Sequence, residues 1–209
     1  PPSSTLPSGV SGRSSPAPVK SACSMRTGSL FPFPTRGSTI LDIKKSKPPS
    51  WRFLFSHPAH LVACGFGSGL SPFAPGTVGT LFAWATFYLF RPWMSDPQLL
   101  VFFIACFIVG VAAVHKTGAD LGVVDHGSIV WDEVVAFWII LWLVMPTGFW
   151  GQLIAFALFR YFDAAKPGPV AWADQQFKGF GWRGGFGILF DDLVAAFCTL
   201  LVIALWRFW

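Results

Sequence analysis

The stretch DEVVAFWIILWLVM, residues 132–145, sets two adjacent acids directly before a run of apolar residues. The stretch DDLVAAFCTLLVIALW, residues 191–206, repeats this order. A further acid, Asp163, closes the apolar run at residues 149–162. Carboxylates at the ends of membrane-length segments are costly, so they are usually kept for function. If these acids converge on one membrane face, they suit a hard divalent cation such as Mg²⁺.

The composition is typical of a membrane protein. Hydrophobic residues make up 53% of the chain and charged residues 12%, whereas soluble domains average about 25% charged residues. The 11 Trp and 23 Phe suit a helical bundle with aromatic belts at the membrane interfaces. The four cysteines are far apart and form no CxxC pair, so neither a disulfide framework nor a zinc site is expected.

The basic residues are concentrated at the N-terminal end. Residues 1–52 hold eight Lys or Arg against one acid, Asp42, and are rich in Ser, Pro and Gly. This composition predicts a disordered basic tail over residues 1–52, followed by a membrane-embedded domain over residues 53–209. The tail fits a cytoplasmic position beside anionic lipid, and no recognition motif supports nucleic acid as a partner.

A Gly- and Pro-rich segment, CGFGSGLSPFAPGTVGT at residues 64–80, interrupts the first apolar stretch. Three alternate glycines followed by prolines disfavour a straight helix. We therefore expect a helix that breaks into a re-entrant or interfacial loop. Ser68, Ser71 and Thr77 in this segment are candidates for phosphate contacts, although Thr77 fits slightly better as the cap of the next helix.

The rest of the chain contains five apolar segments, at roughly 77–93, 98–115, 129–145, 149–162 and 188–206. They predict an all-α, polytopic helical membrane bundle of about four to five spans with short loops between antiparallel neighbours. If the basic tail is cytoplasmic, the loops at residues 116–128 and 164–187 are cytoplasmic too. Every acid cluster and the Gly-rich segment then lie on that same face.

The motif DHGSIVWDE, residues 125–133, carries the first acid pair. On a helix Asp132 and Glu133 lie about 100° apart, so only one can point straight at a shared metal and the other can serve as a base. Favourable acids at a helix N-terminus are the structural alternative. His126 fits a general acid, a phosphate donor or a hydrogen-bonding residue of the loop.

The motif RYFDAAKPGPV, residues 160–170, spaces Arg160, Asp163 and Lys166 three residues apart, on one helical face. This pattern fits an ion-pair ladder at a helix end equally well as a metal-binding acid flanked by phosphate-binding cations. Pro167 is expected to end the helix. In GGFGILFDD, residues 184–192, glycines before the acid pair allow close approach of a ligand, and a helix starting after them can receive an anion.

The four motifs GFGSGLSPFAPGTVG, DHGSIVWDE, RYFDAAKPGPV and GGFGILFDD occur in the order and rough spacing of the phosphatidylglycerophosphatase A family. The chain resembles that family over about residues 57–207. The resemblance implies a Mg²⁺-dependent lipid phosphomonoester phosphatase of the bacterial inner membrane, and the loop layout predicts that its active site is on the cytoplasmic side. Such an enzyme removes the terminal phosphate of phosphatidylglycerophosphate to give phosphatidylglycerol.

The resemblance and the motifs together give a hypothesis for each candidate residue. One or two Mg²⁺ are expected on the five acids Asp132, Glu133, Asp163, Asp191 and Asp192. The catalytic candidates are Glu133, Asp132, His126 and Lys166. The substrate-binding candidates are Ser68, Ser71, Thr77, Arg160, Lys166 and Arg183. Three rival functions stay open: a phosphatase for another membrane lipid phosphate, a cation transporter that uses the same acids, and a non-catalytic membrane subunit.

Overall fold

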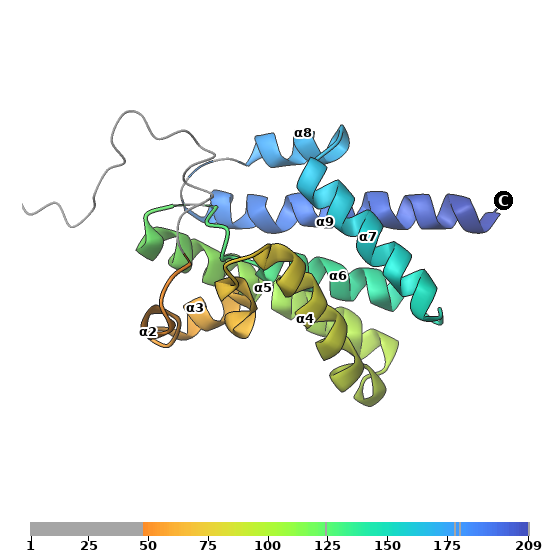
Figure 1. Cartoon of the computed structure of the whole chain (residues 1–209), viewed down its shortest axis with the longest axis horizontal. Coiled ribbons are helices and arrows are strands. Elements are labelled where there is room, and N and C mark those ends of the chain that lie inside the picture. Colours follow the sequence, from red (N-terminus) through yellow and green to blue (C-terminus); the bar gives the residue numbers. More distant parts are fainter. Residues whose placement is uncertain (1–47, 124, 178, 180, 209) are drawn as a thin grey trace, which may run out of the picture. The chain divides into compact units, whose positions relative to one another are not determined.

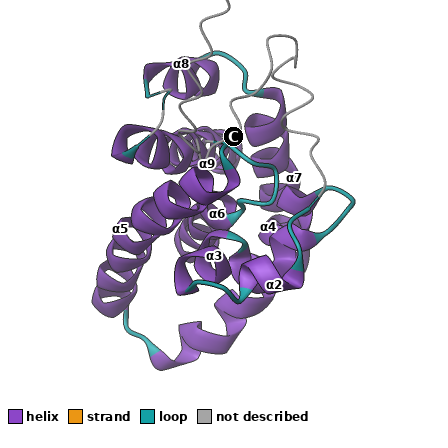
Figure 2. Cartoon of the chain, turned by 90° about the vertical axis from the view of Figure 1, so that its left-hand side faces the viewer, coloured by secondary structure: helices purple, strands orange, loops and turns teal. Residues whose placement is uncertain are grey.

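The computed structural model describes residues 48–123, 125–177, 179 and 181–208 (Figure 1). In these ranges the backbone forms helices joined by loops, and no strand occurs (Figure 2). The all-α prediction is therefore confirmed for the described chain. The expected tail lies largely outside these ranges, so both the tail and the domain boundary after residue 52 stay predictions.

Helix α6, Trp131–Val144, is the centre of the fold because its sequence is apolar on every side. Phe137, Ile140 and Leu141 have no exposed surface, and burying a side chain of this size contributes about 1.5–3 kcal/mol. Four helices pack around α6: α4 (Pro75–Phe90), α5 (Asp96–Leu121), α7 (Phe149–Ala165) and α9 (Trp182–Phe208). Sequence-distant segments thereby meet at the two ends of α6.

Two helices of the described chain, α5 and α9, are long and apolar enough to cross a membrane. Helix α5 begins after Ser95, whose backbone N–H donates to Gln98 Oε1 at 2.9 Å, and it ends at Gly122 in the left-handed conformation. It therefore continues to Leu121, beyond the expected end near residue 115. Helices α4, α6 and α7 have 16, 14 and 17 residues, fewer than the about 20 that a straight span needs.

The Gly- and Pro-rich segment forms a broken helix, as its glycines predict. Helix α3, Pro58–Ala63, gives way to the 3₁₀ segment η1, Gly65–Leu70, in which Phe66 and Gly67 have φ of 55° and 103°. Gly69 lies against the backbone of Ser128, so any side chain there would collide with its carbonyl oxygen. This contact fixes the segment against the loop that leads into α6.

Three short elements complete the described chain: α2 (Trp51–Leu54), η2 (Arg91–Trp93) and α8 (Pro169–Gln176). Helix α8 lies on α9 (Figure 1), and its eight residues fall within the segment at residues 164–187, which was expected to be a loop. Near the start of the described chain, His60 Nε2 lies 2.7 Å from Asp120 Oδ2 and ties α3 to the end of α5.

Candidate active site

The five predicted acids come together where the first turn of α6 meets the last turn of α7 and the first half of α9; we call this set the acidic centre. Its members are Asp132, Glu133, Asp163, Asp191 and Asp192. The carboxylates of Glu133, Asp163 and Asp191 lie close enough to Asp132 to act on its charge, and those of Asp132 and Asp163 act in the same way on Asp192. The convergence predicted from the acid-before-apolar pattern is therefore present in the structure.

Arg160 joins two of these acids across the α6–α7 hairpin. Its Nη1 donates to Glu133 Oε1 at 2.9 Å and to Asp163 Oδ2 at 2.6 Å. The Arg160–Asp163 pair confirms the three-residue spacing as a helix-face contact. Because all three side chains are mostly buried, the guanidinium both neutralises charge and holds the two carboxylates in fixed positions.

Lys166 does not share that helical face, contrary to the prediction. Helix α7 ends at Ala165, and Lys166 follows it with φ of 43°, in the left-handed conformation. This turn directs Nζ to Asp174 Oδ1 at 2.6 Å and to the carboxylate of Asp191. Burial alone lowers the pKa of Lys166, but the charge of Asp191 and the hydrogen bonds to Asp174 and Asp191 outweigh it and raise the pKa above its ordinary value.

The acidic centre contains carboxylate oxygens that no donor satisfies. Asp132 Oδ1 and Asp192 Oδ2 are buried and make no hydrogen bond with any described residue. Buried polar groups are nearly always paired, so such oxygens call for a cation or a donor from a ligand. Arg160 and Lys166 are the two cations seen to pair with the five acids in the described chain.

These features fit a hard divalent cation, whose preferred ligands are carboxylate oxygens. The described side chains nevertheless include no group of three or more His, Cys, Asp or Glu already arranged to hold a metal ion. The chemistry of the donor set and the unsatisfied oxygens of Asp132 and Asp192 suit a metal ion, but the side chains would have to move before they could hold one. Asp132 and Asp192 are the residues best suited to begin that coordination.

The glycines of helix α4 make room for Glu133. A Cβ atom at Gly76 would collide with Glu133 Oε1, and one at Gly79 would come 3.1 Å from Glu133 Oε2. The motif PGTVG thus lets the backbone of α4 approach a carboxylate of the acidic centre. This contact joins the Gly- and Pro-rich motif to the DHGSIVWDE motif through the backbone of α4 and not through one of its side chains.

His126 orders the loop before α6. Its Nδ1 accepts a hydrogen bond from the backbone N–H of Ser128 at 3.1 Å, which places the proton of the neutral ring on Nε2. Burial lowers the pKa of His126, and the negative charge of Asp125 partly opposes this shift. Of the three roles considered, hydrogen bonding within the loop is the one that the structure displays.

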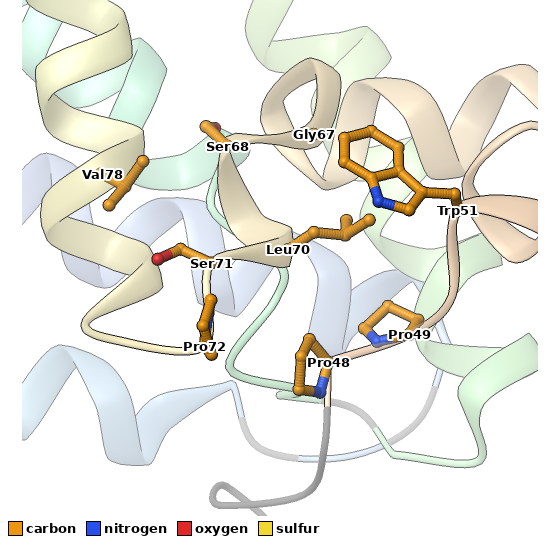
Figure 3. Close-up of a pocket in the computed structure, with 9 residues that line it drawn as sticks. All are labelled: Pro48, Pro49, Trp51, Gly67, Ser68, Leu70, Ser71, Pro72 and Val78. Atoms are coloured by element: carbon orange, nitrogen blue, oxygen red, sulfur yellow. The ribbon is translucent and has the colours of Figure 1, made fainter.

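Ser68 and Ser71 hydrogen-bond within their own loop. Ser68 Oγ donates to the carbonyl of Gly65 at 2.8 Å, and Ser71 Oγ donates to the carbonyl of Phe73 at 2.8 Å. Figure 3 shows both serines between Trp51 and Val78, where they line a hollow of about 490 Å³. None of the five acids lines this hollow, and neither serine is seen to hydrogen-bond to one of them.

Two further candidates differ from their predicted positions. Helix α4 is capped by Ala74 and starts at Pro75, so Thr77 lies inside the helix and the prediction that it caps α4 is wrong. Thr77 does directly follow Gly76, the residue that touches Glu133. Arg183 is exposed in the first turn of α9 and forms no ion pair with any residue that the structure describes.

The glycines before Asp191 serve helix packing rather than a ligand-binding loop. Helix α9 begins at Trp182, ahead of them, so the expected helix start near residue 188 is wrong. Gly185 lies against the backbone of Val111 in α5, and Gly187 lies against Phe177. The sequence GFGWRG at residues 179–184 has the spacing of a dinucleotide-binding loop, but in the described chain it follows helix α8 and not a strand.

Sequence reasoning missed two acids near the centre. Asp174 on α8 binds Lys166, and Asp125 acts electrostatically on His126, Asp132 and Asp191. Asp174 gave no signal because it lies in a short helix of mixed polarity. Asp125 did carry a signal, since it opens the DHGSIVWDE motif, but a turn before Gly127 explained it equally well.

Fold and site together define a helical, membrane-associated protein with a buried acidic centre. The sequence profile of Phosphatidylglycerophosphatase A matches residues 61–207. A protein named Phosphatidylglycerophosphatase A from Escherichia coli strain K12 is 46% identical over 160 residues, which cover 75% of this chain and 87% of the relative. The chain belongs to the phosphatidylglycerophosphatase A family, as its four motifs predicted.

Two other relatives extend this comparison. A protein of the same name from Haemophilus influenzae is 40% identical over 153 residues, covering 73% of this chain and 91% of the relative. A protein from Bacteroides thetaiotaomicron, provisionally named a phosphatidylinositol-3-phosphatase, is 37% identical and covers 70% of this chain and 92% of the relative. No solved structure matches the chain significantly.

Proposed function

We propose that this chain hydrolyses the terminal phosphomonoester of phosphatidylglycerophosphate to give phosphatidylglycerol, with Mg²⁺ as cofactor. The family and two relatives named for this activity support the reaction. The observation that supports an active site at the acidic centre is that Asp132 and Asp192 each have a buried oxygen without a hydrogen-bond partner. A site with this excess of carboxylates needs a cation before it can accept a phosphate.

In this proposal Asp132 and Asp192 would hold the metal, with Asp163 and Asp191 close enough to contribute. Bound Mg²⁺ would supply a more acidic water and neutralise charge on the phosphoryl oxygens. Arg160 and Lys166 balance the remaining negative charge of the phosphate. Because its pKa is raised, Lys166 keeps its proton and acts through its charge.

The remaining residues have positioning or proton-transfer roles. Glu133, held by Arg160 and backed by Gly76, is placed to accept the proton of the attacking water. Asp174 is a positioning residue that holds Lys166. His126 is a positioning residue that orders the turn leading to Asp132.

We further propose that the protein is a multi-pass protein of the bacterial inner membrane, with four to five spans and its acidic centre on the cytoplasmic side. Helix α9 supports this placement. Its 27 residues extend over about 40 Å at 1.5 Å per residue, which exceeds the roughly 30 Å hydrocarbon core. The first turns of α9 can therefore project from the membrane and leave Asp191 and Asp192 near its surface.

A second candidate function keeps the reaction and changes the lipid. The relative from Bacteroides thetaiotaomicron is provisionally named for a different phospholipid headgroup, although it aligns over most of this chain. The two functions share a membrane lipid that carries a terminal phosphate. They differ in the headgroup alone, so phosphate release from the two lipids, measured in parallel, distinguishes them directly.

The deciding experiment measures phosphate release from phosphatidylglycerophosphate by the purified, detergent-solubilised chain, with Mg²⁺ and with EDTA. We expect Mg²⁺-dependent release that is lost in Asp132→Asn. Phosphatidylinositol 3-phosphate, assayed in parallel, should give a much lower rate. No release from a folded protein on the first lipid, together with release from the second, would overturn the proposed substrate and keep the reaction.

A further inference from the structure

We propose that the groove between α4 and α7 binds one acyl chain of the phospholipid substrate; this inference rests on the proposed function. The groove contains a hollow of about 430 Å³. Leu81, Trp84, Ala85 and Tyr88 of α4 and Phe149 and Gln152 of α7 line it. This hollow is separate from the one beside Ser68, and none of the five acids lines it.

The lining of this hollow suits a hydrocarbon better than a polar ligand. Gln152 is 4% exposed, and its Oε1 accepts hydrogen bonds from Trp84 Nε1 at 2.8 Å and from Tyr88 Oη at 2.7 Å. Its Nε2 donates to the carbonyl of Thr147 at 2.9 Å. The polar hydrogens are thus used within the wall, and the surfaces left for a ligand are ring faces and aliphatic groups.

Both walls of the groove continue to the acidic centre. Along α7, Phe149, Gln152, Phe156 and Arg160 follow one another at spacings of three or four residues, so they share one face. Arg160 is the residue bound to Glu133. Arg160 follows Gln152 by eight positions, which corresponds to about 12 Å along the helix.

The opposite wall shows the same continuity. On α4, Thr77, Leu81, Trp84 and Tyr88 recur at the same spacing, and Gly76 beside Thr77 touches Glu133. A lipid whose phosphate lies at the acidic centre can therefore extend along the same two helix faces toward the hollow. This continuity identifies the occupant as a chain of the substrate.

An aromatic floor joins the two walls. The ring of Trp84 stacks on Phe149 at 5.8 Å and on Phe156 at 5.7 Å between centroids, and it meets Phe137 of α6 edge-on at 6.1 Å. Leu81, Tyr88 and Phe149 remain half-exposed or more above this floor. Apolar surface of this kind binds an acyl chain in proportion to the methylene groups that it covers.

The test compares two exposed alanines on different helices. Ala85→Trp fills the hollow, whereas Ala105→Trp adds the same ring to an exposed position of α5 that lines neither hollow. Phosphate release is measured with dipalmitoyl and with dihexanoyl phosphatidylglycerophosphate, because only the longer chain can reach the hollow. We expect Ala85→Trp to lower the ratio of long-chain to short-chain kcat/KM by about tenfold, since it excludes several methylene groups.

Ala105→Trp should leave this ratio at the wild-type value. A ratio in Ala85→Trp equal to that of the wild type, or an equal fall in both variants, overturns the proposal. Leu81→Trp serves as a second filling variant if Ala85→Trp does not fold. Its expected result is the same.

A binding readout separates this proposal from the proposed function. Dipalmitoyl phosphatidylglycerophosphate with a diazirine near one chain end is photolysed with the protein, and the labelled positions are mapped. We expect labelling at residues 81–88 and 149–152 that exceeds labelling of α5 and is lost in Ala85→Trp. If neither substrate releases phosphate, the proposed function fails. The labelling alone then shows whether the groove binds an acyl chain. Equal labelling of both regions overturns the proposal.

Discussion

The two ends of helix α7 each bury a polar side chain, and they do so in opposite ways. Near its start, Gln152 has a partner for both its carbonyl and its amide group. Near its other end, Arg160 meets an acidic centre in which Asp132 and Asp192 each have an oxygen without a partner. The same helix thus borders a balanced cluster, in which Gln152 has all its hydrogen-bond partners, and an unbalanced cluster, in which acidic oxygens lack donors.

This difference separates stability from function. A satisfied buried amide rigidifies the packing and needs nothing from outside. A buried carboxylate without a partner destabilises the fold, so its presence calls for a functional explanation such as a ligand that completes it. The balance of donors and acceptors, more than burial or polarity alone, supports the proposal that the acidic centre is the functional end.

The largest expected effect is at the unbalanced end. Asp192→Asn should lower phosphate release by at least about 100-fold, because a ligand to the proposed cation is lost. The melting temperature should stay the same or rise, since an uncompensated buried charge is removed. Activity assays and thermal unfolding in detergent test both statements. If the variant has a lower melting temperature and full activity, Asp192 stabilises the fold and does not hold the proposed cation.

A smaller loss is expected where α4 meets the centre. In Gly76→Ala the new methyl group collides with Glu133 Oε1, so Glu133 must move away from its contact with Arg160. We expect kcat to fall by about tenfold, because a small displacement of a catalytic group is costly. Gly148→Ala is the matched control, since nothing lies within 4 Å of its added Cβ. Equal activity in the two variants would contradict the role given to Gly76.

At the balanced end, near Gln152, a mutation should change the stability of the fold. Gln152→Leu leaves the Trp84 N–H and the Tyr88 hydroxyl without their acceptor, which should lower the free energy of unfolding by about 1–3 kcal/mol. Gln175→Leu, at an exposed position on α8, is the control and should change it by less than about 0.5 kcal/mol. Denaturation in mixed micelles measures both. An unchanged Gln152→Leu protein would show that this cluster is not structural.

The smallest effect concerns pH and His126. Because burial lowers its pKa, the folded state favours the neutral ring. The stability that depends on this neutral ring is full above about pH 6.5, the ordinary value, and is lost as the pH falls below it. His126→Asn keeps an acceptor for Ser128 but does not titrate. Its melting temperature should therefore fall less than that of the wild type between about pH 7.5 and 5.5; parallel curves would contradict this.

The sequence predicted the parts of the site that follow from pattern. Acids placed before or after apolar runs are rare enough to be noticed, and the convergence of α6, α7 and α9 follows from antiparallel packing. The broken helix before α4 was equally predictable, since alternate glycines and prolines leave the backbone few helical options.

The parts that escaped prediction depend on tertiary contacts. The left-handed turn at Lys166 cannot be read from its residue type, and it alone directs Nζ away from Arg160 and to Asp174. Gly185 was predicted to let a ligand approach the backbone before a helix start, but it lets α9 lie against α5 inside a regular helix. In both cases the neighbouring element, and not the local sequence, decides the conformation.

The pairing of Glu133 with Arg160 has a consequence for how the protein is made. The acid opens α6 and the cation lies near the end of α7, so each charge finds its partner only after both helices have been synthesised. Four residues, 145–148, connect these helices. Helices α6 and α7 should therefore enter the bilayer together as a hairpin, because that hairpin is the smallest unit in which the charge of Glu133 is compensated.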